Sequence, residues 1–147
     1  MIFVDANYFI RAVTVPVTPV EQAMAEMATG LFQLVERGEE EITTSEAVLA
    51  EVAYILSGKR HYRPRPAETG ERLKPILLLH GFRLPTKRIC LRALDRWATF
   101  PRLDFVDVLG AAYAEVQATR LASFDADFDR LPGIVRWNPA VDGSESL

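Results

Sequence analysis

Apolar residues follow two alternating periods along the chain, and the alternation predicts strands separated by helices. Short apolar runs typical of buried strands cover residues 2–4, 41–44, 120–124 and 134–137. Helical spacing predicts helices over 6–13, 19–37, 45–57, from 66 to a break at Pro75, over 86–98 and from 104 to about 118. Strands that alternate with helices favour a parallel sheet with helices on both faces.

The two longest apolar stripes have clear helix boundaries. Thr18-Pro19-Val20-Glu21 is a capping box with proline at the first helical position, and Gly38 ends that helix. Thr43 or Thr44 is expected to cap the next helix. The first stripe consists of Val20, Ala23, Met24, Met27, Leu31, Leu34 and Val35, and the second of Val48, Leu49, Val52, Ile55 and Leu56. We expect both to contribute to the core, with the two methionines as core filling.

Length and composition narrow the class of protein. The 147 residues predict one domain, 1–147, with a flexible tail from about residue 138. A formal net charge of −3 argues against a protein that coats nucleic acid non-specifically. The single Cys90 lies among apolar residues and is expected to be a buried structural thiol. Without a signal peptide, a membrane-spanning run or a disulfide pair, the chain is expected to be cytoplasmic and to have no membrane partner.

Five aspartates flank one helix near the end of the chain and form the main chemical signal. Asp104 has the position of an N-cap, whereas Asp107 is either a first-turn acid that favours the helix dipole or a functional carboxylate. The helix is apolar all round and is expected to be buried, with Ala111, Ala114 and Ala118 on the side of Asp107. Asp125 follows a strand-like run. Asp127 and Asp129 are expected on the solvated face of a short helical turn.

Four acids are predicted to meet at one edge of the sheet. Asp5 and Asp125 each follow a strand, Asp107 begins a helix, and Glu51 lies a turn or so into the helix after the second strand. Glu51 is either a partly buried acid or a boundary residue whose carboxylate reaches water. Two carboxylates about 4 Å apart repel by about 4 kcal/mol at an effective dielectric constant near 20. The set therefore favours a hard divalent cation, Mg²⁺ or Mn²⁺.

Other chemical signals are weaker. The cluster over residues 59–65 is the only dense basic one, and Lys59, Arg60, Tyr62 and Arg63 either contact RNA or are solvated loop residues. The sequence lacks a phosphate-binding glycine motif, a G-x-S-x-G elbow and a Cys/His cluster. Carboxylate chemistry is what remains.

Four stretches together resemble a known family. They are M-x-x-V-D-A-N at the start, T-S-E-A-V-L-A-E-V, D-F-V-D-V-L-G-A-A-Y-A and S-F-D-A-D-F-D-R-L-P-G. In order and spacing they are similar to the motif regions of the PIN-domain ribonucleases, and most similar to the VapC-type toxins of toxin–antitoxin pairs. The resemblance runs from Ile2 to about Trp137. It implies a three-layer α/β/α PIN-like fold with a short, mainly parallel central sheet.

The resemblance also implies an activity and its residues. The family's activity is RNA cleavage that depends on Mg²⁺, for which Mn²⁺ can substitute, and its members are frequently homodimers inhibited by a cognate antitoxin. By motif position, Asp5, Asp107 and Asp125 would bind metal and Glu51 would complete the catalytic set. Accessory positions would fall to Asn7, Ser123 and Asp127. Val108 departs from the alanine that usually follows the third acid.

The sequence thus predicts a metal-dependent endoribonuclease that acts as a toxin. One alternative is a catalytically inactive PIN-like module that binds RNA or protein. Another is a phosphotransfer enzyme with an aspartyl nucleophile, of the haloacid-dehalogenase type. That type requires an aspartate two residues after the nucleophile, and Asn7 occupies this position.

Overall fold

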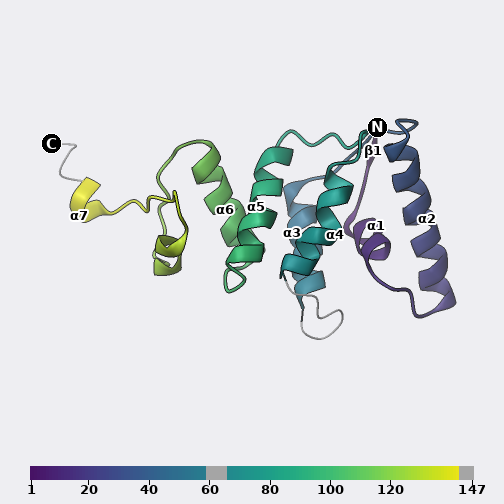
Figure 1. Ribbon diagram of the computed structural model, residues 1–147, viewed down its shortest axis with the longest axis horizontal. Helices are drawn as coiled ribbons and strands as arrows, with labels where there is room; N and C mark the ends of the chain where they lie inside the picture. Colours follow the sequence, from purple (N-terminus) through teal and green to yellow (C-terminus); the bar gives the residue numbers. More distant parts are fainter. Residues whose placement is uncertain (59–65, 143–147) are drawn as a thin grey trace.

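The computed structural model describes residues 1–58 and 66–142 and has a mainly helical α/β fold (Figure 1). The elements are β1 (Ile2–Phe3), α1 (Ala6–Val13), α2 (Pro19–Glu36), β2 (Ile42–Thr43), α3 (Glu46–Ser57), α4 (Pro66–Leu77), α5 (Lys87–Thr99), α6 (Phe105–Val116), a 3₁₀-helix η1 (Ala126–Arg130) and α7 (Pro139–Asp142). The short helix α7 occupies part of the segment that was predicted to be a flexible tail.

The sheet is parallel, as predicted, but shorter than predicted. Strand β1 pairs with β2 in the register Ile2–Ile42, and Phe82 adds a single parallel bridge to Ile42. Among the described residues, the two later strand-like runs form only one bridge, between Leu121 and Arg136, and neither pairs with β1. The predicted strands over 120–124 and 134–137 are therefore reduced to one bridge that stands apart from the sheet.

Helix boundaries follow local capping chemistry. The predicted capping box at Thr18 is confirmed, because Thr18 Oγ1 accepts a hydrogen bond from the Glu21 N–H at 3.2 Å. Gly38, with φ +74°, follows the end of α2 as predicted. The cap of α3 was assigned wrongly: Ser45 Oγ accepts from the Val48 N–H at 3.2 Å, one residue beyond the predicted threonines.

Helix α4 continues through Pro75, so the predicted break there is wrong. Pro75 lies three positions from the end of the helix, where the missing N–H removes a single intrahelical bond. The Leu78 N–H still bonds to the Lys74 carbonyl at 3.0 Å. The helix keeps its course because Leu73, Ile76 and Leu77 are all buried around the proline.

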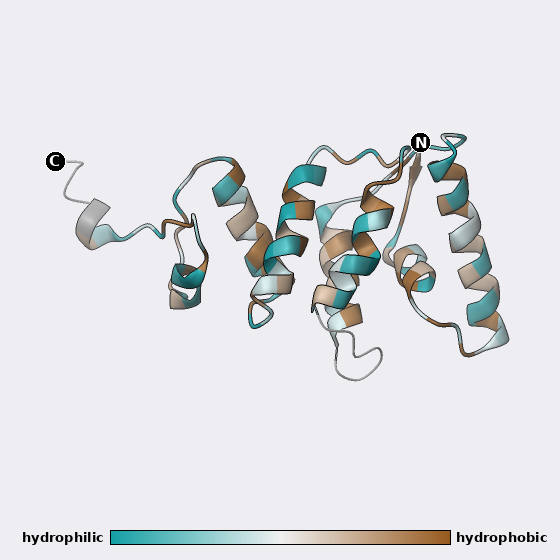
Figure 2. Cartoon of the chain, viewed as in Figure 1, coloured by the Kyte–Doolittle hydropathy of each residue, from teal (hydrophilic) through white to brown (hydrophobic). Residues whose placement is uncertain are grey.

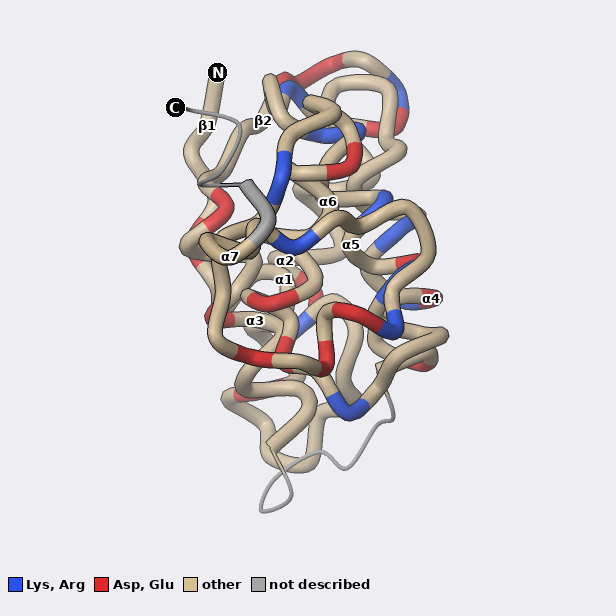
Figure 3. The backbone as a smooth tube through the Cα atoms, turned by 90° about the vertical axis from the view of Figure 1, so that its left-hand side faces the viewer, with Lys and Arg blue, Asp and Glu red and all other residues tan. Residues whose placement is uncertain are grey.

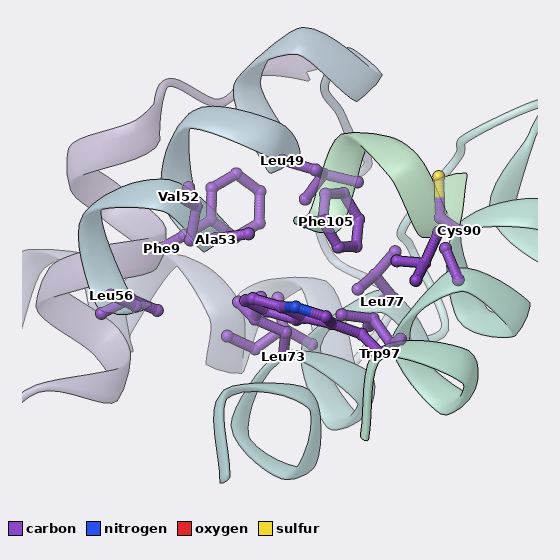
Figure 4. Packing of buried hydrophobic residues seen from close by; sticks show 14 of the residues in the cluster. Phe9, Leu49, Val52, Ala53, Leu56, Leu73, Leu77, Cys90, Trp97 and Phe105 are labelled. Atoms are coloured by element: carbon purple, nitrogen blue, oxygen red, sulfur yellow. The ribbon is translucent and has the colours of Figure 1, made fainter. Parts of the chain in front are cut away.

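The core is built on α3, α4, α5 and the start of α6 (Figure 4). Helix α3 contributes four fully buried residues, and Phe9 packs against Phe32 with ring centroids 5.7 Å apart. Cys90 is buried in this core, as predicted, and burial raises the pKa of its thiol to about 11. The residues that Figure 4 labels are Phe9, Leu49, Val52, Ala53, Leu56, Leu73, Leu77, Cys90, Trp97 and Phe105.

Helix α2 does not bury the stripe that its sequence predicted. Its buried residues are Ala28, Phe32 and Val35, whereas Val20 is 70% and Met27 63% exposed. Hydrophobic and hydrophilic residues alternate along this helix in Figure 2. The helix packs chiefly on α1 and lies at one end of the molecule, so only one of its two apolar rows reaches the core.

After α6 the chain leaves the helical body as an arm, which we define as residues 117–137. Ala118, predicted to lie on the helix beside Ala111 and Ala114, instead follows its end with φ +53°. Val106 on α6 is exposed, so this helix is not buried on every side. The arm and β1 lie near opposite ends of the long axis in Figure 1. Phe128 and Leu131 of the arm are buried and belong to the hydrophobic core cluster.

Candidate acidic site

Asp107 is held by the start of its own helix. It is the third residue of α6 and half-buried, and its Oδ2 accepts a hydrogen bond from the Asp104 N–H at 3.2 Å. Asp104 is the N-cap residue, as predicted, and is exposed. Both acids therefore take part in the start of α6, Asp104 as the N-cap residue and Asp107 through its Oδ2. The other oxygen of Asp107, Oδ1, is the part of this carboxylate that a ligand could use.

A surface hollow of about 320 Å³ lies beside Asp107. Trp97 at its base is fixed by a hydrogen bond from its Nε1 to the Leu103 carbonyl at 3.0 Å and by an edge-on contact with Phe105. The hollow combines carboxylates, hydroxyls and aromatic surface, which suits a partly apolar, partly cationic ligand. Its lining is Ala50, Tyr54, Ser57, Trp97, Asp104, Phe105, Val106 and Asp107. Tyr54 and Ser57 were not predicted, because nothing in the helix pattern distinguishes them from other exposed residues.

Asp5 stands where β1 ends and α1 begins. It is the N-cap residue of α1, with extended backbone at φ −86° and ψ 165°, but its side chain makes no capping hydrogen bond. Both Asp5 and Asn7 are exposed. An exposed N-cap carboxylate that makes no capping hydrogen bond is available to a ligand, because the helix does not use its oxygens.

Glu51 is exposed on α3, so of the two alternatives for this residue the solvent-facing one is correct. Its neighbours Leu49, Val52 and Ala53 are buried, and the helix turns position 51 outward between them. Ala50 and Tyr54, on either side of Glu51 along the helix surface, line the hollow beside Asp107.

The arm carries the remaining predicted residues in a tight turn. The Asp125 N–H donates to Ser123 Oγ at 3.1 Å, and Asp125 Oδ1 accepts from the Asp127 N–H at 2.9 Å. Ser123 therefore orients the backbone of Asp125. Asp127 and Asp129 lie on η1, the predicted helical turn, and both are exposed. Arg136 binds Asp129 through two hydrogen bonds of 3.0 and 2.8 Å and lowers the pKa of its carboxyl group.

The single chain does not gather these acids. Over residues 1–58 and 66–142, no three His, Cys, Asp or Glu side chains form a group able to hold a metal ion. Carboxylate oxygens are the ligands that Mg²⁺ and Mn²⁺ prefer, so the donor chemistry fits. The positions do not fit within one chain, because Asp125 precedes η1 in the arm. The arm lies away from β1, which Asp5 follows (Figure 1). The meeting of the four acids at one site therefore remains a prediction; they are Asp5, Glu51, Asp107 and Asp125.

The most strongly perturbed carboxylate was missed by the sequence reasoning. Glu115 on α6 binds Arg92 and Arg96 of α5, with closest distances of 2.6 and 2.9 Å, and these hydrogen bonds lower its pKa to about 2. Arg96 also donates to the Pro132 carbonyl at 2.9 Å. The cluster holds the arm to the body, which makes it structural. Figure 3 looks onto this end of the molecule and shows acidic and basic positions close together there.

The predicted RNA contacts Lys59, Arg60, Tyr62 and Arg63 lie outside the described residues. Within the described part of the chain, no helix is long and apolar enough to cross a membrane.

A short parallel sheet accompanied by helices, with Asp5 shortly after its first strand, defines an α/β protein with a carboxylate at the sheet edge. The sequence profile of the PIN domain matches residues 2–134, and the chain belongs to the PIN domain family. No curated protein sequence matches the chain closely. PIN domains are generally metal-dependent nucleases, most of them ribonucleases, and they typically use divalent ions. The predicted family and fold class are thus confirmed at this level.

Proposed function

We propose that this protein is an endoribonuclease dependent on Mg²⁺ or Mn²⁺ and that it acts as the toxin of a toxin–antitoxin pair. The observation that carries the proposal is the PIN domain match over residues 2–134. Within this range we assign Asp5, Glu51, Asp107 and Asp125 to the family's motif positions by the resemblance of the four sequence stretches. A divalent ion bound by such acids would supply positive charge at an RNA phosphodiester. Asn7, Ser123 and Asp127 would serve as accessory residues, and the segment 59–65 would contact RNA.

The division of roles between two neighbouring acids tests the proposal. Asp107→Asn keeps an oxygen that can accept the Asp104 N–H, so the cap survives while the charge is lost. We expect this variant to fold and to lose RNA cleavage. Asp104→Ser keeps a good N-cap residue and should cleave at close to the wild-type rate. Cleavage of a labelled RNA in Mn²⁺ and in EDTA, with circular dichroism as the folding control, measures both.

Equal losses in the two variants would contradict this division of roles. The catalytically inactive module is the second candidate function, and the scattered acids of the single chain favour it. Wild-type protein that binds RNA but cleaves none in Mg²⁺ or Mn²⁺, both as isolated and after release from any bound partner, would establish that alternative.

An antitoxin would use two features of this surface. The α2 stripe of Val20, Met24 and Met27 is exposed, so it is available to the apolar residues of a partner segment. The α3 stripe is not available, since Leu49, Val52 and Leu56 are in the core. Exposed carboxylates also favour a guanidinium, which pairs with them in a planar, two-pronged manner. We therefore propose that the antitoxin's C-terminal segment lies along α2 and places an arginine against Asp5, Asp107 or Asp125.

Changing the antitoxin's C-terminal arginines to alanine tests this arrangement. The altered antitoxin should bind more weakly and should lose inhibition of RNA cleavage. Arginine-to-lysine changes form the matched control, because they keep the charge and remove the planar pairing. Undiminished inhibition by the alanine variant at every Mg²⁺ concentration would contradict the arginine contact. Met27→Glu in the toxin should weaken binding through the α2 stripe, whereas Glu26→Gln beside it should not.

A further inference from the structure

Strand β1 has one hydrogen-bonded edge and one open edge. The Ile2 N–H bonds to the Glu41 carbonyl and the Val4 N–H to the Thr43 carbonyl, both at 2.9 Å. Successive residues of a strand direct their backbone groups to opposite sides, so the N–H and C=O of Phe3 point away from β2. In the described chain nothing pairs with this side of β1. Ile2 and Phe3 are 39% and 59% exposed, which is unusual for the first strand of a sheet.

The arm carries a second open edge. The Leu121 N–H bonds to the Val135 carbonyl at 2.9 Å, and the Trp137 N–H bonds to the Leu121 carbonyl at 2.8 Å. By the same alternation, the Ala122 C=O and the Phe124 N–H point to the other side. Neither group has a partner among the described residues. Phe124 is fully exposed at the end of this edge. Exposed, unpaired edges of this kind readily pair with another strand.

The two open edges match in register. In a parallel ladder one residue bonds to the residues before and after its partner. Phe3 can donate to the Ala122 carbonyl and accept from the Phe124 N–H, which aligns Phe3 with Ser123. The same register aligns Asp5 with Asp125, two residues further along each strand. Neighbouring strands lie about 4.8 Å apart, so the pairing would bring these two carboxylates to one place.

The arm of the same chain is not free to make this pairing. Phe128 and Leu131 are buried, and Asp127 and Arg130 lie against the loop 99–103 at the α5–α6 end. Arg96 binds the Pro132 carbonyl at the same end. Figure 1 places this end far from β1. Moving the arm onto its own β1 would expose these residues and break these bonds, whereas a second copy can bring its arm to β1 with the anchors intact.

We propose that two copies of the chain exchange arms, so that residues 121–124 of each copy pair in parallel with β1 of the other. The exchange closes both sheets and completes each acidic site with Asp125 from the partner copy. This inference deepens the proposed function by naming the partner that completes the same site. Its test measures association and needs neither RNA nor metal, so it can fail or succeed independently of the nuclease activity.

Paired cysteines test the exchange directly. Residues aligned across neighbouring strands have the Cα separation of a disulfide, so Phe3→Cys in one chain should crosslink to Ser123→Cys in another. The two chains, each with one introduced cysteine beside the native Cys90, are co-expressed, one with a size tag, and oxidised. We expect a tagged–untagged dimer on non-reducing gels. The matched control pairs Ser123→Cys with Tyr54→Cys, which is exposed on α3 and should give only background. Cys90 is buried and unaffected.

Two outcomes of the crosslinking would overturn the proposal. One is the absence of the mixed dimer above the Tyr54→Cys background. The other is a double variant, Phe3→Cys with Ser123→Cys in one chain, that forms only an internal disulfide, because this would mean that the arm closes on its own sheet.

The backbone itself provides a second test. Phe3→Pro removes the one N–H that faces the open edge and leaves the Ile2 and Val4 bonds to β2 in place. Phe3→Val is the matched control, since it shortens the side chain and keeps the N–H. Size-exclusion chromatography with light scattering should show a dimer for the wild type and Phe3→Val, and a monomer with unchanged helix content for Phe3→Pro. A monomeric wild type, or masses that grow without limit, would contradict a closed pair.

Discussion

Different kinds of interaction stabilise the helical body, which comprises residues 1–58 and 66–116, and the arm, residues 117–137. The body buries a continuous apolar cluster that extends across α1 to α6. The arm adds Phe128 and Leu131 to this cluster and has backbone hydrogen bonds between Leu121 and residues 135 and 137. In addition it relies on charged groups: Arg96 donates to the Pro132 carbonyl, and Arg136 binds Asp129. The difference matters because apolar burial involves no titrating group, whereas charged hydrogen bonds respond to pH and are screened by salt.

This contrast has a consequence for the candidate site. Asp5, Glu51 and Asp107 belong to the rigid body, and Asp125 belongs to the arm. An acid on an element outside the helical body can be supplied by a second copy of the chain while the body stays folded. Whether the acidic set is complete thus depends on where the arm lies. Substitutions in the body and substitutions in the arm should therefore have separable effects.

The largest effect is expected in the body. Leu56→Ala removes a fully buried side chain from the α3 stripe and should lower the free energy of unfolding by about 2–5 kcal/mol. Met27→Ala on α2 is the control, because Met27 has the same helical spacing but is 63% exposed and should cost less than about 1 kcal/mol. Urea unfolding followed by circular dichroism measures both. Similar losses in the two variants would mean that the α2 stripe is covered.

These two helices also show how far the sequence could predict the fold. Both have apolar residues at helical spacing, and both helices were predicted with nearly correct ends, because capping residues act locally. Periodicity cannot reveal which apolar row meets the core, since that depends on where the helix is packed. Val20 and Met27 were therefore placed in the core although they are exposed, while Val52 and Leu56 were placed correctly.

For the candidate site, too, the sequence predicted local features but not those that depend on how distant segments pack. Short-range features were correct: Asp104 as the cap, the helical turn at Asp127 and Asp129, and the buried Cys90. For Glu51 the solvent-facing alternative is correct. The predicted break at Pro75 was wrong, because the packing of its buried neighbours overrode the local signal. The meeting of Asp5 with Asp125 depends on which strands pair, and strand pairing is a long-range property that a single sequence leaves open.

An effect of intermediate size is expected at acidic pH. The pKa of Glu115 is lowered to about 2 in the folded protein by its hydrogen bonds to Arg92 and Arg96, against an ordinary value near 4.5. The stabilisation is therefore complete above about pH 4.5 and is lost as the pH falls toward 2. Hydrogen bonds to charged groups contribute about 1.5–3 kcal/mol, and we expect a loss at the lower part of this range for a partly exposed cluster.

Glu115→Gln isolates this contribution. The variant should be less stable than the wild type at pH 7 and should lose less stability between pH 4.5 and pH 2.5. Glu36→Gln, at an exposed glutamate of α2, is the matched control for the loss of one carboxylate. Hydrogen exchange of the arm amides at pH 7 should be faster in Glu115→Gln than in the control, because Arg96 holds the arm through Pro132. Equal exchange rates would mean that the Glu115 cluster does not stabilise the arm.

The smallest effect is expected at the junction between body and arm. Ala118 adopts φ +53°, its N–H bonds to the Glu115 carbonyl at 3.2 Å, and the Thr119 N–H bonds to the Ala114 carbonyl at 2.9 Å. This is the pattern in which glycine normally ends a helix, because a side chain costs about 1–2 kcal/mol in the left-handed region. Ala118→Gly removes that cost but adds freedom to the unfolded chain, which takes back about 0.4–1 kcal/mol. We expect a net stabilisation of about 0.5–1 kcal/mol, measurable as a rise in Tm. Ala98→Gly, within α5, should destabilise by a similar amount because its backbone is helical. A fall in Tm for Ala118→Gly would mean that the left-handed turn, and with it the outward course of the arm, is not the conformation in solution.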